Sequence, residues 1–199
     1  YCVLEYILNC RHCGSPLRLP FLALGSAPPS NAYLTEADLR APETWSPLRI
    51  LVCEECWMVQ TEDPAGREDL LTRDYAYFSS FSTSWLEHAR QYLKMMVDRF
   101  GLNSSSRVVE VAANDGYLLQ YVQAAGIPCY GVEPTAGTAA AAREKGIEII
   151  ERFFGIELAD ELVMAGRQAD LIAANNVLAH VPDINDFTAG FARLLKPDG

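Results

Sequence analysis

The chain has 199 residues, half of them hydrophobic, and carries a formal net charge of −10. At about 100–200 residues per domain, this length corresponds to one medium domain or two small ones. The acidic balance argues against a nucleic-acid partner, which needs a basic surface. The apolar runs are too short to span a membrane, and no signal-peptide pattern precedes the apolar segment Leu17–Leu24. We therefore expect a cytoplasmic protein with no membrane partner.

Four of the six cysteines form two C-x-x-C pairs, Cys10 with Cys13 and Cys53 with Cys56. Each pair places two thiolates on one backbone knuckle, and a tetrahedral zinc ion needs two such knuckles. The pairs are further apart than the common spacing of about 12–20 residues, so a loop or a small sheet must bridge them. Residues 14–52 contain many prolines and favour loop and turn. The pattern predicts a zinc-binding domain over residues 1–71 with a structural Zn²⁺; disulfides would be the alternative in a secreted protein.

Residues 72–104 are expected to form a connector and one long helix. The connector is polar and aromatic, and the helix is predicted from Trp85 to Phe100 by a single apolar stripe. Ser84 is the expected N-cap, because Glu87 three residues later would complete a capping box. Gly101 is expected to end the helix.

Strands and helices alternate through the remaining residues, 105–199. Such alternation predicts a parallel sheet with right-handed crossovers, which is a Rossmann-like α/β domain. Only four strands are expected before the chain reaches Gly199, so the sheet should be incomplete. Either the chain is part of a larger protein, or a partner covers the open edge of the sheet. The strands are predicted at 107–112, 129–133, 147–151 and 169–174, and the helices at 116–125, 136–145, 156–165 and 184–195.

The segment Arg107–Glu133 predicts a nucleoside-binding corner. Its turn has one glycine, Gly116, where dinucleotide sites use G-x-G-x-x-G to approach a pyrophosphate. Glu110 and Asp115 would repel a pyrophosphate and attract an ammonium or sulfonium group. Glu133, at the end of the next strand, can accept hydrogen bonds from a ribose diol. These features favour S-adenosylmethionine over NAD, although a βαβ unit without any ligand is also consistent with them.

With these motifs together, the chain resembles the S-adenosylmethionine-dependent sugar C-methyltransferases, which methylate nucleotide-linked keto-deoxysugars. The resemblance implies a zinc-binding domain followed by a class I methyltransferase domain, of which only the N-terminal part would be present. It extends over nearly the whole chain, through C-x-x-C at Cys10, Pro28–Leu34 (PPSNAYL), Cys53–Gln60 (CEECWMVQ), Tyr75–Ser80 (YAYFSS), the run VEVAANDGYLL and Asn175–Asp183 (NNVLAHVPD).

The resemblance also implies which residues surround S-adenosylmethionine. Many methyltransferases have glycine where this chain has Ala112, and the methyl group narrows the space beneath the methionine portion. Phe153 and Phe154 follow the third strand and are predicted either to flank adenine or to belong to the core. The complete predicted set is Glu110, Ala112, Asn114, Asp115, Gly116, Glu133, Phe153, Phe154 and Asn175.

His180, Tyr75 and Tyr77 are the predicted catalytic or substrate-site residues. Of the two tyrosines, Tyr75 is favoured, because the resemblance aligns it with a substrate-site tyrosine of the family. An imidazole titrates in the range that suits proton transfer near neutral pH, and phenols suit the substrate mouth. Family members can carry histidine in place of Phe78, and the family's further catalytic tyrosine and glutamate–histidine pair would lie beyond residue 199. The expected partner is a small-molecule acceptor such as a nucleotide-linked sugar. The alternatives are an O- or N-methyltransferase and a non-catalytic binding module.

Overall fold

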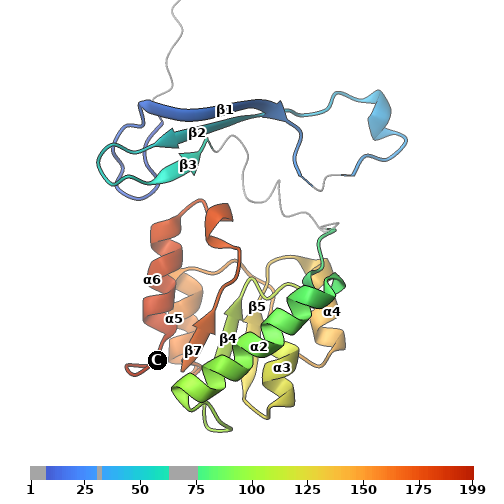
Figure 1. The fold of residues 1–199 in the computed structure, drawn as a ribbon, viewed down its shortest axis with the longest axis vertical. Helices are drawn as coiled ribbons and strands as arrows, with labels where there is room; N and C mark the ends of the chain where they lie inside the picture. The colour runs from blue at the N-terminus through green and yellow to red at the C-terminus, as the bar shows by residue number, and fades with distance from the viewer. Residues whose placement is uncertain (1–7, 31–32, 63–75) are drawn as a thin grey trace, which may run out of the picture. The chain divides into compact units, whose positions relative to one another are not determined.

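The computed structural model describes residues 8–30, 33–62 and 76–199, and it divides into two compact units (Figure 1). The first unit takes in residues 1–70 together with 182–185, and the second takes in residues 71–181 and 186–199. Among the described residues, no helix combines the length and the apolar character needed to cross a membrane.

The N-terminal unit contains an antiparallel sheet of three strands in the order β1-β2-β3. The strands are β1 (Leu19–Ala27), β2 (Ser46–Val52) and β3 (Val59–Thr61), and a short 3₁₀ turn, η1 (Asp38–Arg40), lies between β1 and β2. The loop-and-turn prediction for residues 14–52 is therefore wrong over the two long strands. Their prolines stand where a sheet tolerates them: Pro20 is in the edge strand, and Pro47 precedes the part of β2 that pairs with β3.

The C-terminal unit is built on a parallel sheet of four strands in the order β6-β5-β4-β7. This arrangement confirms the predicted Rossmann-like architecture. All four residues of β4 are buried, as expected for a central strand covered on both faces. The strands are β4 (Val108–Val111), β5 (Cys129–Val132), β6 (Ile149–Ile150) and β7 (Leu171–Ala173).

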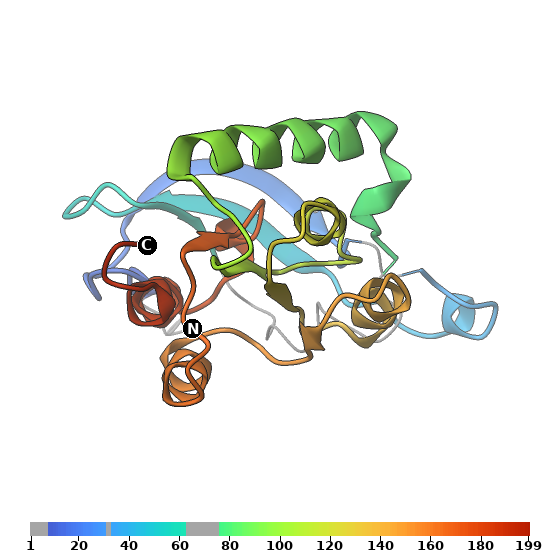
Figure 2. The same cartoon turned by 90° about the horizontal axis from the view of Figure 1, so that it is seen from below.

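Helices cover both faces of this sheet (Figure 2). One buried cluster joins the sheet to α2, α3 and α4, and a second joins it to α5 and α6. The two clusters leave the carboxyl ends of the strands, where ligands bind in such sheets, to be shaped by loops. The helices are α2 (Thr83–Phe100), α3 (Leu119–Ala124), α4 (Ala136–Glu144), α5 (Ile156–Met164) and α6 (Ile184–Leu194).

Helix α2 begins two residues earlier than predicted. Its N-cap is Ser82, whose Oγ accepts a hydrogen bond from the Trp85 backbone N–H at 3.2 Å. Glu87 does not close a capping box but pairs with Arg90, so the prediction of Ser84 as the cap was wrong. Gly101 ends the helix in the left-handed conformation, φ 64°, as expected.

Candidate cofactor and zinc sites

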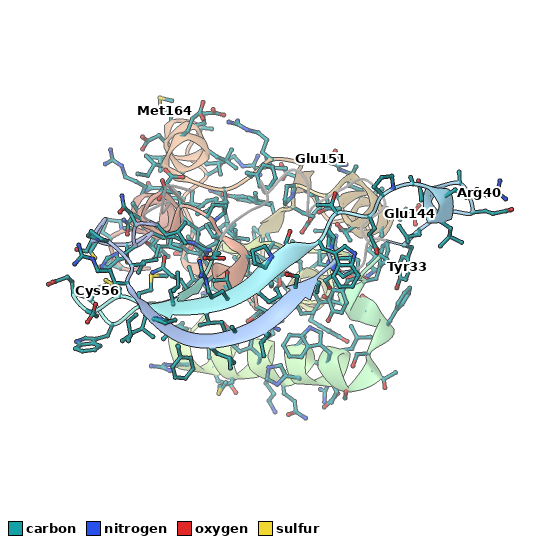
Figure 3. All side chains as sticks on the ribbon, turned by 90° about the horizontal axis from the view of Figure 1, so that it is seen from above. Tyr33, Arg40, Cys56, Glu144, Glu151 and Met164 are labelled. Atoms are coloured by element: carbon teal, nitrogen blue, oxygen red, sulfur yellow. The ribbon has the colours of Figure 1, made fainter. Side chains whose placement is uncertain are left out.

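The four cysteine sulfurs of the N-terminal unit lie within 4.8 Å of one another. The Cys10–Cys56 sulfur distance is 3.6 Å and the Cys13–Cys53 distance is 3.5 Å. Sulfurs bound to one tetrahedral zinc at about 2.3 Å stand about 3.8 Å apart, whereas a disulfide needs about 2.05 Å. The cluster therefore fits a four-thiolate zinc site and excludes disulfide pairing. Figure 3 shows sulfur atoms gathered beside Cys56, close to one end of the β1–β2 ribbon.

The two cysteine pairs sit on matching backbone turns. The N–H of Gly14 donates to the Cys10 carbonyl, and the N–H of Trp57 donates to the Cys53 carbonyl, both at 2.9 Å. Gly14 and Trp57 both have positive φ, 76° and 62°, one residue after the second cysteine of each pair. This repeated turn directs two sulfurs inward from each side, as a closed structural site requires.

Gln60 on β3 supports the cysteine cluster from outside. Its Nε2 donates to the Cys10 sulfur at 3.3 Å, and its Oε1 accepts from the Arg11 backbone N–H at 3.0 Å. Burial acts to raise the pKa of Cys10, but hydrogen bonds from the Cys13 and His12 backbone and from Gln60 outweigh it and lower the pKa to about 6. Sequence reasoning missed Gln60, which stands four residues beyond the second pair in the stretch Cys53–Gln60.

In the C-terminal unit, the turn after β4 adopts an unusual backbone. Ala112, Asn114 and Gly116 all have positive φ, at 58°, 51° and 75°. A Cβ on Gly116 would stand 2.4 Å from Ile147 Cδ1, so both its conformation and its close packing require glycine. A residue with a Cβ is strained at positive φ, and such backbone strain is concentrated at functional sites.

Three predicted carboxylates gather around this turn. Glu110 on β4 is fully buried, Asp115 is 3% exposed and Glu133 is 5% exposed. Neither oxygen of Glu110, nor Asp115 Oδ1, has a hydrogen-bond partner among the residues that the structure describes. Burial raises the pKa of Glu110 well above its usual range. The nearby Tyr117 hydroxyl acts to lower this pKa, whereas the charges of Glu133 and Asp115 raise it further. A cation bound here would lower the pKa of Glu110 and let it ionise, whereas a phosphate would raise that pKa further, so the site favours a cationic ligand.

Glu133 holds the backbone of the turn after β4 in place. Its Oε2 accepts from the Asn114 backbone N–H and its Oε1 from that of Thr135, both at 2.9 Å. Each carboxylate oxygen has a second lone pair. Its predicted role toward a ribose is therefore compatible with these bonds.

Asn175, which follows β7, donates from its Nδ2 to the Tyr117 hydroxyl at 2.9 Å. Burial, followed by the nearby Glu110 charge, raises the pKa of Tyr117 above its usual range, so the phenol stays protonated. The Tyr117 ring also packs on Trp85 of α2. Tyr117 thus joins Asn175, a predicted cofactor residue, to α2, and its place directly after Gly116 in the turn was the only sequence signal for it.

The structure separates the two phenylalanines after β6. Phe154 is 8% exposed and packs edge-on against Phe187 and Phe191 of α6. Phe153 is only partly buried. Phe154 is therefore a core residue and Phe153 is more accessible. A contact of either ring with adenine stays a prediction.

Of the predicted catalytic residues, His180 and Tyr77 can be located. His180 is exposed and ends the 3₁₀ turn η3 (Leu178–His180) in the loop after β7. Tyr77 is 51% exposed, and its carbonyl oxygen accepts from Asn114 Nδ2 at 3.1 Å, which brings the connector to the β4 turn. Tyr75 lies outside the described residues.

The chain matches the models of two protein families. Residues 85–199 match the model of the methyltransferase domain family, and residues 10–70 match a model described as a zinc binding domain. The chain belongs to the methyltransferase domain family and carries an N-terminal zinc-binding domain, within which the four cysteines cluster.

A curated relative is C-methyltransferase NovU from Streptomyces niveus, which is 32% identical over 197 residues. The match covers 99% of this chain and 47% of NovU, so the chain spans about half the length of this relative.

Two solved structures show the range of similar folds. Magnesium protoporphyrin IX methyltransferase from Synechocystis PCC 6803, with bound SAM, is 15% identical over 68% of this chain and 75% of its own, with a TM-score of 0.46. A SAM-dependent methyltransferase from Geobacter sulfurreducens is 16% identical over 68% and 53% of the two chains, with a TM-score of 0.42. With TM-scores this low, neither likeness adds to the assignment.

Proposed function

We propose that the C-terminal unit binds S-adenosylmethionine and that the protein is an S-adenosylmethionine-dependent C-methyltransferase acting on a small ketone. The observation that carries the proposal is the buried carboxylate group of Glu110, Asp115 and Glu133 at the carboxyl ends of β4 and β5. S-adenosylmethionine brings a sulfonium, an ammonium and a ribose diol, which carboxylates can bind, and it has no phosphate for them to repel.

The proposed acceptor is a nucleotide-linked keto-deoxysugar. Support comes from the similarity to a C-methyltransferase over 99% of this chain and from the resemblance of the connector and of the loop Asn175–Asp183 to sugar C-methyltransferases. A small-molecule acceptor in the cytoplasm, without nucleic acid or membrane, also fits the net charge of −10.

Methylation of a carbon beside a ketone requires an acid–base step before the transfer. A base removes the α-proton, the electron pair of the C–H bond forms an enolate, and the α-carbon then forms its bond to the donated methyl group. S-adenosylmethionine, when bound, would supply that methyl group: its sulfur–methyl bond would break and the electron pair would stay on sulfur, which becomes a neutral thioether. His180, exposed after β7, is the proposed proton acceptor, and the Tyr77 phenol is the proposed donor of a hydrogen bond to the ketone oxygen.

The proposal is tested by product analysis with the zinc-loaded protein, S-adenosylmethionine and a nucleotide-linked keto-deoxysugar. We expect NMR to place the new methyl group on carbon, and His180→Ala to lower the rate about 100-fold or more, the usual range for a lost acid–base group. A methyl group on oxygen or nitrogen would overturn the C-methyltransferase assignment. An undiminished rate in His180→Ala would overturn the role of His180 alone.

A further inference from the structure

The connector to α2 is bound directly to the turn after β4, residues 112–116, which we call the cofactor turn. We define the connector strap as residues 76–82, which include the 3₁₀ turn η2 (Ser79–Phe81). The Asn114 amide contacts the strap with both ends: its Oδ1 accepts from the Ser79 backbone N–H at 2.9 Å and its Nδ2 donates to the Tyr77 carbonyl at 3.1 Å. The side chain of Asn114, expected to face the cofactor, therefore holds the strap in place.

A second attachment lies one residue further along the strap. The ammonium of Lys145, at the C-terminal end of α4, donates to Ser80 Oγ at 2.9 Å and to the Asp115 carbonyl at 2.6 Å. It is also 3.4 Å from Asp115 Oδ2, which in turn accepts from the Ser80 backbone N–H at 3.3 Å. An ammonium has three donors, and these three contacts use all of them.

The environment of Lys145 makes this attachment stronger than an ordinary surface ion pair. The Lys145 side chain is 32% exposed, and that of its partner Asp115 is 5% exposed. Partly buried pairs are screened less by water and salt than exposed ones. The end of a helix also favours a positive charge at this position.

We propose that Lys145 is a positioning residue of the methyltransferase site. Its hydrogen bonds to Ser80 and Asp115 hold the connector strap against the cofactor turn, and we call this set of contacts the clasp. Asn114 holds the strap at Tyr77 and Ser79, and Asp115 Oδ2 holds the Ser80 backbone. Lys145 adds a bond to the Ser80 hydroxyl and pairs with the Asp115 carboxylate. The strap and the turn then move as one unit, so the donor site is formed with the strap already in place. The role in cofactor binding rests on the proposed function above, whereas the clasp itself is a property of the chain alone.

The clasp is tested first without any ligand, by hydrogen exchange of the strap amides. Lys145→Met keeps the length of the side chain and removes its charge and donors. We expect exchange at Ser79 and Ser80 to accelerate about tenfold, the scale of one charge-assisted hydrogen bond, while β4 and β5 keep their protection. Lys94→Met, an exposed lysine on α2, is the matched control and should leave the strap unchanged. Unchanged exchange at Ser79 and Ser80 in Lys145→Met would overturn the clasp.

The positioning role is tested by calorimetric titration of the zinc-loaded protein with S-adenosylmethionine. We expect Lys145→Met to weaken binding about 3- to 10-fold and Ser80→Ala to weaken it less. The double variant should be no weaker than Lys145→Met, because both substitutions break the same contact. Faster strap exchange with unchanged affinity would overturn the positioning role. Failure of the unsubstituted protein to bind would overturn the proposed function instead, and the exchange experiment would still decide the clasp.

Discussion

Replacing Ala112 with glycine should stabilise the C-terminal unit, although the substitution removes a methyl group. Ala112 has φ 58°, and a residue with a Cβ in this left-handed region is strained by about 1–2 kcal/mol. Glycine relieves that strain but makes the unfolded chain freer, which costs about 0.4–1 kcal/mol. The expected net gain is about 0.5–1 kcal/mol. For a chain of this length, that gain raises Tm by about 1–4 °C.

The neighbouring Ala113 provides a matched control. It is fully buried, lacks a positive φ, and its methyl group fills the space that a Cβ on Gly131 would enter at 2.6 Å. Ala113→Gly should therefore destabilise by about 1 kcal/mol or more, through added backbone freedom and lost packing. Thermal and urea unfolding of the two variants should show changes of opposite sign. A loss of stability in Ala112→Gly as large as that in Ala113→Gly would refute the reasoning from backbone strain.

Three further predictions concern the metal, the sheet and the buried acid. Gln60→Ala should weaken zinc binding about 10- to 100-fold in a chelator competition, because Gln60 donates to the Cys10 sulfur; an unchanged affinity would remove it from the site. Gly131→Ala should destabilise by about 1–3 kcal/mol in urea unfolding, since its Cβ would press on Ile149 at 2.6 Å, and a neutral effect would contradict the close packing. Glu110 has a raised pKa, so its contribution to stability is full below about pH 4.3 and is lost as the pH rises through the folded-state value. Glu110→Gln should remove that loss at pH values above about 4.3, and identical pH profiles would argue against a buried acid.

The elements with strong local signals could be predicted from the sequence. The strand and helix order of the C-terminal unit followed from apolar runs separated by helical spacing, and the structure shortens several elements at their ends. The zinc cluster followed from two C-x-x-C pairs, because their spacing fixes two ligands at a time. Glu133 could be expected at a strand end, since the carboxyl ends of parallel strands share one edge.

The remaining features depend on contacts that spacing does not encode. Strand β1 is exposed along nearly its whole length and contains proline, so it lacks the alternation that marks a half-buried strand. Ser82, Thr83 and Ser84 all qualify as helix caps, and only the backbone geometry selects Ser82. The clasp by Lys145 joins segments far apart in the chain, and no local pattern indicates it.

The central claim is that the carboxylate-lined turn after β4 binds S-adenosylmethionine. It is tested most directly by calorimetric titration of the zinc-loaded protein with S-adenosylmethionine, with NAD⁺ titrated in parallel. We predict saturable binding of S-adenosylmethionine at one site per chain and no binding of NAD⁺, whose pyrophosphate would meet the Asp115 carboxylate. A folded, zinc-loaded protein that binds no S-adenosylmethionine, or that binds NAD⁺ instead, would contradict the claim.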